Sequence, residues 1–169
     1  MISLGLAKTP TVIIAHRGSG DHLEASFDNL KLCYENIIVV GPKNSYFSKV
    51  IEDKGGLWVS SDSPHLDELW EEGIKARQSD WYMLIQDAEY LSTVLKESVI
   101  ETMLKNQVKP IFYPFERRKF FLKQRLKYNL DWTHDPPSGL LFIQNHSISF
   151  DDFFNSVKTE PLKGDLIHF

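Results

Sequence analysis

The sequence predicts one α/β domain of three layers, in which helices cover both faces of a mostly parallel sheet. Short apolar runs recur at residues 11–15, 37–40, 57–60 and 81–85. Segments with helical periodicity separate these runs, and strands that alternate with helices are typical of βαβ units. The chain has 169 residues, of which 42% are hydrophobic and 25% charged, so it is long enough to bury one core.

Helix signals fall between the apolar runs. Asp21 followed by Glu24 resembles a capping box and predicts the start of the first helix. The apolar positions of this helix are Leu23, Phe27, Leu30 and Leu32. Gly55 and Gly56 predict the end of the second helix, because glycine readily adopts the backbone conformation that terminates helices.

The third helix is expected to begin with Ser63 as its N-cap and Pro64 as its first residue, and to end near Arg77. A fourth helix is expected at 92–106, followed by a fifth strand at 111–113. The residues predicted on the buried side of the fourth helix are Val94, Leu95, Val99, Met103 and Leu104. A loop that contains Gly139 and an apolar run at 140–143 lie further along the chain.

Charge and composition exclude several classes of protein. The net charge of -4 provides no general attraction to nucleic acid, so a nucleic-acid partner is not expected. Cys33 is the single cysteine and lies in an apolar helical pattern, which predicts a buried, inert thiol and no intrachain disulfide. The sequence has neither the pattern of a signal peptide nor an apolar stretch of membrane-spanning length. These features predict a cytoplasmic protein. A further prediction is peripheral contact with the inner face of the membrane.

Polar loops follow the first four predicted strands, at 16–20, 41–44, 61–63 and 86–89. Ligands of open parallel sheets bind beyond the carboxyl ends of the strands, so these loops are the candidate binding site. A dinucleotide fingerprint is excluded because its third glycine position is Leu23. The sequence also lacks a Walker A loop and a nucleophile elbow.

The segment DWYMLIQDAEYLS at 80–92 resembles the fourth-strand motif of family 2 inverting glycosyltransferases. In that family an apolar strand ends in a short acidic motif, Asp-Ala-Asp-Glu or Gln-Ala-Asp-Glu. The segments ENIIVVG at 35–41 and EEGIKARQSDW at 71–81 resemble the family's second strand and the helix before its motif strand. LKGDLIHF at 162–169 resembles a late strand that ends in an Ile-His pair.

The resemblance implies a Rossmann-like sheet of the GT-A nucleotide-diphospho-sugar transferase type. It also implies inverting transfer of a sugar from a nucleotide-diphosphate donor to a saccharide or lipid-linked acceptor, in surface polysaccharide biosynthesis. A divalent metal, Mg²⁺ or Mn²⁺, would neutralise the diphosphate. Its ligands would be Asp87, Glu89 and His168. The residues predicted to contact the nucleotide are His16, Arg17, Gly18, Gly41, Asp62, Gln86 and Asp87.

Departures from the family pattern leave alternatives open. Aligned without a gap from Trp81, the central aspartate of the motif falls on Ala88, and Gly41 and Pro42 stand where many relatives have an aspartate. The chain also ends one residue after His168, without the further helices that relatives carry. A second hypothesis is therefore a non-catalytic domain of the same fold that binds a nucleotide or a partner. A third is another doubly wound domain, such as a response-regulator-like or methyltransferase-like fold.

The single domain is expected to divide into a nucleotide-binding core at about 9–106 and an acceptor-side region at about 107–169. An inverting transfer needs a base for the acceptor hydroxyl, and Asp135 is preferred over Glu116, Asp131 and His134. The basic segment at 117–128 is expected to form an amphipathic helix. This helix either contacts an anionic membrane, through residues 116–128, or covers the core with a solvated basic face.

Overall fold

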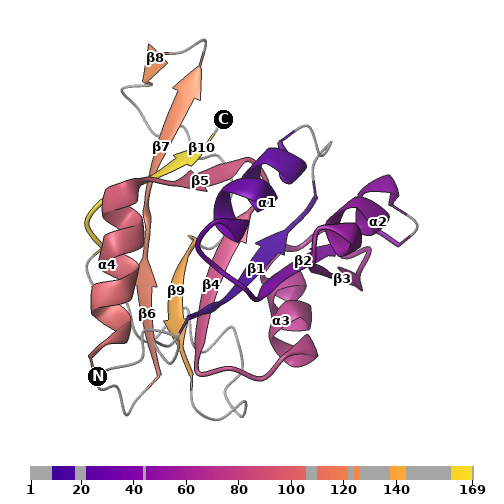
Figure 1. Ribbon diagram of the computed structural model, residues 1–169, viewed down its shortest axis with the longest axis horizontal. Helices are drawn as coiled ribbons and strands as arrows, with labels where there is room; N and C mark the ends of the chain where they lie inside the picture. Colours follow the sequence, from indigo (N-terminus) through magenta and orange to yellow (C-terminus); the bar gives the residue numbers. More distant parts are fainter. Residues whose placement is uncertain are drawn as a thin grey trace.

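The computed structural model describes residues 9–17, 22–43, 45–105, 110–121, 124–125, 138–143 and 161–168. In chain order the elements are β1 (Thr11–Ala15), α1 (Leu23–Lys31), β2 (Ile37–Gly41), α2 (Tyr46–Asp53), β3 (Leu57–Ser60), α3 (Leu66–Ala76), β4 (Trp81–Gln86), β5 (Glu89–Leu91), α4 (Thr93–Met103), β6 (Ile111–Pro114), β7 (Glu116–Phe121), β8 (Gln124–Arg125), β9 (Gly139–Phe142) and β10 (Asp165–His168) (Figure 1). The first four strands and the helices between them alternate as the sequence predicts.

The main sheet has six strands in the order β3-β2-β1-β4-β9-β6. Strands β1 to β4 are mutually parallel, whereas β9 is antiparallel to both β4 and β6. The sheet is therefore mostly parallel, which confirms the predicted α/β class. In the flavodoxin-like order of response regulators β1 lies between β2 and β3. Here β1 lies between β2 and β4, so the response-regulator alternative is wrong.

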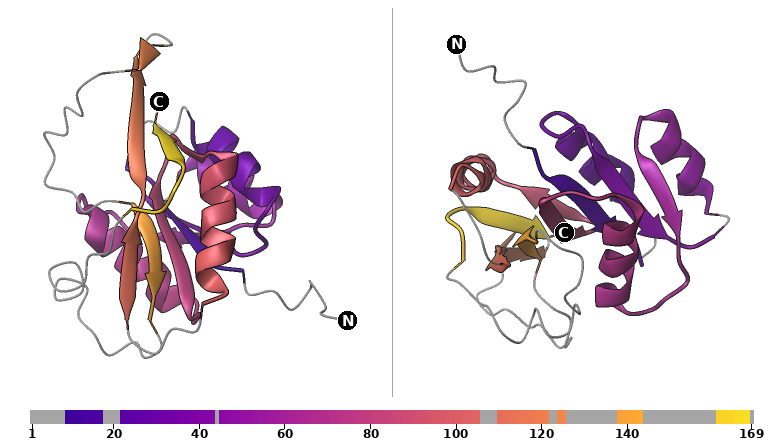
Figure 2. Two further views of the ribbon diagram at one scale, coloured as in Figure 1. Left: turned by 90° about the vertical axis from the view of Figure 1, so that its left-hand side faces the viewer. Right: turned by 90° about the horizontal axis from the view of Figure 1, so that it is seen from below.

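Helices cover the two faces of this sheet (Figure 2). On one face, apolar side chains of α1, α2 and α4 form a single cluster with the strands, and it includes Phe27, Ile51 and Val99. On the other face, α3 packs through residues such as Leu69 and Trp70. All five strand positions of both β1 and β2 are buried, because they contact helices on either side. The fold thus has the three predicted layers.

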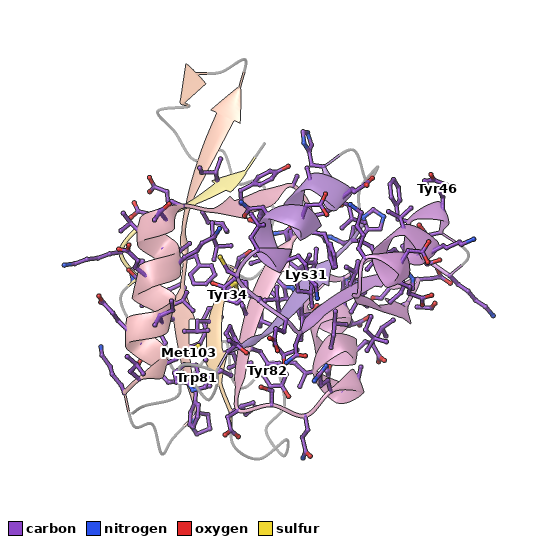
Figure 3. The ribbon with its side chains drawn as sticks, in the orientation of Figure 1. Lys31, Tyr34, Tyr46, Trp81, Tyr82 and Met103 are labelled. Atoms are coloured by element: carbon purple, nitrogen blue, oxygen red, sulfur yellow. The ribbon has the colours of Figure 1, made fainter. Side chains whose placement is uncertain are left out.

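Two tyrosines lie on opposite sides of the helical layer that α1, α2 and α4 form on one face of the main sheet (Figure 3). Tyr34, which follows α1, is 4% exposed and belongs to the cluster under α1 and α4. Tyr46, at the start of α2, is 79% exposed and points away from the core (Figure 3).

A second sheet has the order β5-β10-β7-β8. Only Phe115 separates β6 from β7, so the chain passes directly from the main sheet into the second one. Leu91, Phe115 and Leu166 extend the first apolar cluster into this sheet. Strands β7 and β8 reach beyond the rest of the described fold at the top of Figure 1.

The predicted basic helix is wrong where the structure describes it, because Glu116–Phe121 form β7 and Gln124–Arg125 form β8. Strand β7 pairs in parallel with β10, which lies far along the chain, and in an antiparallel hairpin with β8. Such pairing routinely overrides local helix propensity. Gly139, predicted in a loop, is the first residue of β9.

Several finer predictions also need correction. Val94 and Leu104 are 53% and 73% exposed, whereas Leu95, Val99 and Met103 are buried as predicted. Positions 95, 99 and 103 lie on one helical face, and α4 ends at Met103, before Leu104. Cys33 is exposed because α1 ends at Lys31, so the thiol lies beyond the buried stripe of that helix.

The helix ends follow the predicted signals in part. Gly55, with φ of 89°, follows α2 and confirms the predicted stop. The N-cap of α3 is His65 instead of Ser63, although the Ser63 hydroxyl accepts a hydrogen bond from the His65 backbone N–H at 3.2 Å. Asp21 lies outside the described residues. Within the described ranges, no helix combines the length and apolar character that crossing a membrane requires.

Candidate functional site

The first residues after β1 and β4 lie side by side at the carboxyl edge of the main sheet. The backbone N–H of His16 donates to the Val40 carbonyl at 2.8 Å, and that of Asp87 donates to the Ala15 carbonyl at 3.1 Å. These bonds continue the parallel ladder one residue past the strands. The chain leaves β1 toward β2 and β3 and returns on the other side as β4. The strand order therefore reverses between β1 and β4, which is where ligands of such sheets bind.

A cleft of about 600 Å³ opens at this position. Every one of the first four strands contributes to it through the residues at or directly after its carboxyl end. The cleft is lined by His16, Arg17, Pro42, Ser61, Asp62, Ser63, Pro64, Gln86 and Asp87. The structure thus brings together five of the residues that the sequence predicts to contact a nucleotide, namely His16, Arg17, Asp62, Gln86 and Asp87.

His16 and Asp87 form a hydrogen-bonded pair in the wall of the cleft. The distance from His16 Nδ1 to Asp87 Oδ2 is 2.8 Å, and the two side chains are 4% and 17% exposed. An ionised carboxylate can only accept hydrogen bonds, so Nδ1 is the donor when Asp87 is charged. The rings of Phe47 and Trp58 contact the imidazole edge-on, with centroids 5.8 and 5.9 Å away. The imidazole is therefore held from several sides, and it fixes one oxygen of the carboxylate.

Gly41, the last residue of β2, lies close to the rings of His16 and Trp58 and does not line the cleft. A Cβ atom at this position would come within 2.9 Å of Trp58 Cζ2 and 3.0 Å of His16 Cδ2. Such distances are too short for an ordinary contact, so only glycine allows the two rings to approach β2 as closely as they do. The structure supplies a packing role for Gly41, while its predicted contact with a nucleotide stays a prediction.

Arg17 extends across the cleft and joins its two walls. Nη1 donates to the Pro64 carbonyl at 3.2 Å, in the loop between β3 and α3, and Nη2 lies 3.4 Å from Gln86 Oε1 at the end of β4. The side chain is exposed. A guanidinium at this place presents a permanent positive charge to any ligand in the cleft.

The loop after β3 forms the opposite wall. The backbone N–H of Ser61 donates to the Gly41 carbonyl at 2.7 Å, which places this loop against the end of β2. The Ser63 hydroxyl donates to the Glu68 carboxylate, in the first turn of α3. Asp62 is exposed between them and lines the cleft. This wall offers hydroxyl and carboxylate oxygens, which suit ligand hydroxyl and N–H groups.

Glu89 faces the interior and not the cleft. Its side chain is 0% exposed, and Oε1 accepts hydrogen bonds from the Gln86 backbone N–H at 2.6 Å and from the Ser138 hydroxyl at 2.7 Å. Ala88, between Asp87 and Glu89, has φ of 66°, a left-handed conformation. The chain therefore turns sharply between β4 and β5, and this turn directs Asp87 outward and Glu89 inward.

The remaining predicted residues are placed only in part. The backbone of His168 pairs with Glu89 across β10 and β5, so the late strand does reach the acidic turn. The side chain of His168 lies outside the described part of the structure, as do Gly18 and Asp135 entirely. Among the residues that are described, no three His, Cys, Asp or Glu side chains are grouped as a metal site requires. The metal set of Asp87, Glu89 and His168 stays a prediction.

Four residues around the site were missed by sequence reasoning. Phe47 and Trp58 hold His16, Ser138 bonds to the Glu89 carboxylate, and Ser26 Oγ donates to the Glu89 carbonyl at 2.7 Å. Each of these contacts joins residues far apart in the chain. No motif or spacing in the sequence signals them.

A scan against models of protein families finds none that matches the chain, and a search of curated proteins also finds no match.

Proposed function

We propose that the cleft binds a nucleotide-diphosphate sugar and that the protein is a glycosyltransferase of the hexosyltransferase type. The observation that carries this proposal is the cleft itself. It lies at the carboxyl ends of four parallel strands, where their order reverses, and it combines Arg17 with oxygen-bearing groups of Asp62 and the neighbouring serines. Its volume of about 600 Å³ is within the usual range for small-molecule sites.

The two walls suit the two ends of such a donor. Arg17 is the group expected to meet phosphate, because a guanidinium can bind two phosphate oxygens at once. The Asp62 carboxylate is expected to accept hydrogen bonds from the ribose or the base, and the Ser61 hydroxyl can donate or accept them. The GT-A type of fold belongs to this proposal, and the mostly parallel sheet with its antiparallel β9 is compatible with it.

The proposed reaction is inverting transfer to a saccharide or lipid-linked acceptor, in surface polysaccharide biosynthesis. The acceptor oxygen forms a bond to the anomeric carbon while the bond from that carbon to the diphosphate oxygen breaks. The electron pair of the broken bond leaves with the nucleoside diphosphate, and a base removes the proton of the acceptor hydroxyl. Asp135 remains the predicted base, and it lies outside the described residues.

Of the three predicted metal ligands, Asp87 and Glu89 face different surroundings, and the side chain of His168 lies outside the described part of the structure. Asp87 lines the cleft, but one of its oxygens is bonded to His16. Glu89 is fully buried, and its Oε1 is bonded to Gln86 and Ser138. A hard cation such as Mg²⁺ or Mn²⁺ needs several oxygen ligands that converge on one point. No step is therefore derived through a metal.

A thermal-shift screen tests the proposal. The purified chain is heated with UDP, GDP, CDP or dTDP, each with Mn²⁺ and with EDTA. Binding to the folded state alone should raise the melting temperature, with about 2.7 kcal/mol of stabilisation when the ligand is at about 100 times its Kd. We expect one base to give a clear shift. No shift with any nucleotide, in a sample shown to be folded, would contradict the proposal.

A blocking variant locates the binding. Ser61→Trp places an indole in the cleft lining and should abolish the shift. Ser60→Trp is the matched control, because Ser60 is the exposed neighbour that does not line the cleft. Equal shifts in both variants would show that the nucleotide binds elsewhere.

A non-catalytic nucleotide-binding domain is the second candidate. The burial of Glu89 favours it, since that carboxylate is part of the acidic motif that the family uses. Nucleoside diphosphate release from a sugar donor distinguishes the two candidates. Binding with no release, in the presence of a broad set of saccharide acceptors, would favour the non-catalytic domain.

A further inference from the structure

One arginine, Arg17, lines the cleft together with the carboxylates of Asp62 and Asp87. Arg17 spans the cleft, whereas Glu89 is turned into the core and Asp87 is bonded to His16. Arg17 therefore presents a cation to the cleft directly, and of the two predicted metal ligands whose side chains are described, Asp87 lines the cleft and Glu89 does not.

We propose that Arg17 binds the donor diphosphate directly and that donor binding needs no divalent cation. This inference rests on the proposed function, because it names the group that recognises the diphosphate in the same cleft. The ligand class is a nucleoside diphosphate, either free or bearing a sugar.

Two of the hydrogen bonds that Arg17 makes in the cleft can be exchanged for bonds to a ligand. Both acceptors given by the described contacts, the Pro64 carbonyl and the Gln86 amide, are neutral oxygens at 3.2 and 3.4 Å. Hydrogen bonds from a guanidinium to phosphate oxygens are shorter and stronger than bonds to neutral acceptors. The side chain is also exposed, so little desolvation opposes the exchange.

Asp87 then has a role opposite to that of a metal ligand. Its carboxylate lines the same cleft as Arg17 and is 17% exposed. Without a cation between them, a carboxylate and a diphosphate repel each other. Removing the charge of Asp87 should therefore strengthen diphosphate binding, whereas removing a metal ligand should weaken it. The sign of this change separates the two modes of binding.

Isothermal titration calorimetry of the full chain with UDP, GDP, CDP and dTDP tests the inference, once in EDTA and once in Mn²⁺. We expect the preferred nucleotide to bind in EDTA with an affinity within about threefold of that in Mn²⁺. Arg17→Gln should weaken this binding by about tenfold or more, since it loses charge-assisted bonds. Arg17→Lys keeps the positive charge but loses the planar guanidinium group, so its affinity should lie between those of the wild type and Arg17→Gln. Arg77→Gln, at an exposed position after α3, is the matched control and should bind like the wild type.

Asp87→Asn supplies the second readout. It preserves an oxygen that can accept from His16 and should raise the affinity for the nucleotide in EDTA by about threefold or more. Asp80→Asn, at an exposed position before β4, should leave the affinity unchanged. The melting temperature of each variant without ligand confirms that it is folded.

The outcomes separate this inference from the proposed function. Binding that requires Mn²⁺, unchanged binding in Arg17→Gln, or weaker binding in Asp87→Asn would each overturn the inference and leave the proposed nucleotide site in place. The absence of binding by every nucleotide in both conditions would reject the proposed function, and the inference with it.

Discussion

Replacing Glu89 by alanine is expected to destabilise the fold severely, although the residue stands in an acidic motif. The carboxylate is 0% exposed and accepts two hydrogen bonds, from the Gln86 backbone N–H at 2.6 Å and the Ser138 hydroxyl at 2.7 Å. These bonds hold the turn between β4 and β5 and attach it to β9. Alanine removes the acceptor and leaves both donors near or within the core.

The magnitude follows from the two contacts. A hydrogen bond to a charged group contributes about 1.5–3 kcal/mol, so two of them give a loss of about 3–6 kcal/mol in the free energy of unfolding. That is a large part of the roughly 5–15 kcal/mol by which domains are stable. Glu89→Gln keeps an oxygen acceptor in the same place, and neutral bonds contribute about 1 kcal/mol each. We therefore expect Glu89→Gln to cost about 1–4 kcal/mol.

Urea unfolding, followed by tryptophan fluorescence, measures these free energies by linear extrapolation. Glu97→Ala is the matched control, because Glu97 is an exposed glutamate on α4 and its loss should change stability by less than about 0.5 kcal/mol. If Glu89→Ala unfolds within about 1 kcal/mol of the wild type, the two bonds do not hold the turn and the reasoning is refuted.

Three further predictions concern packing, ionisation and reactivity. Gly41→Ala should lower the free energy of unfolding by about 1–3 kcal/mol, since its Cβ would lie 2.9 Å from Trp58 Cζ2; unchanged denaturation would disprove the close contact. Burial raises the pKa of Tyr34 above its usual 10.0, so the folded state favours the neutral phenol. This stabilisation is fully present below about pH 10 and is lost as the pH rises above it. The fall in stability above about pH 10 should be smaller in Tyr34→Phe than in the wild type or in the exposed control Tyr46→Phe. Equal pH profiles of the urea midpoints in all three proteins would contradict this. The exposed Cys33 should react with a thiol reagent in the folded protein as fast as a free thiol, and protection until unfolding would show that it is covered.

The first four strands could be predicted because their signal is local. Runs such as residues 11–15 and 57–60 are bounded by polar or glycine-bearing segments, and the structure gives strands with the same bounds. The position of the cleft followed from a topological rule, since residues at the carboxyl ends of parallel strands meet at one edge. His16, Arg17 and Asp87 could therefore be assigned to one site without any knowledge of their partners.

The second sheet could not be predicted because its signal is distant. The basic and aromatic residues of Glu116–Phe121 are compatible with either a helix or a strand, and the pairing with β10 decides between them. The inward direction of Glu89 depends on the left-handed conformation of Ala88 and on Ser138, which directly precedes β9 and is distant in the sequence. A one-residue shift reverses the direction of a side chain, and the spacing of carboxylates alone does not reveal it.

The central position of β10 in the second sheet has a consequence for the order in which the chain folds. Strand β10 lies between β5 and β7. Residues 89–91 and 116–119 can therefore pair with it only after residues 165–168 are in place. Closing such long loops is slow compared with forming the local βαβ units. During synthesis on the ribosome, strands β1 to β4 can therefore pair early. The edges of β5 and β7 that face β10 stay unpaired until residues 165–168 have been made. This interval is when the nascent chain is most exposed to mispairing with other strands.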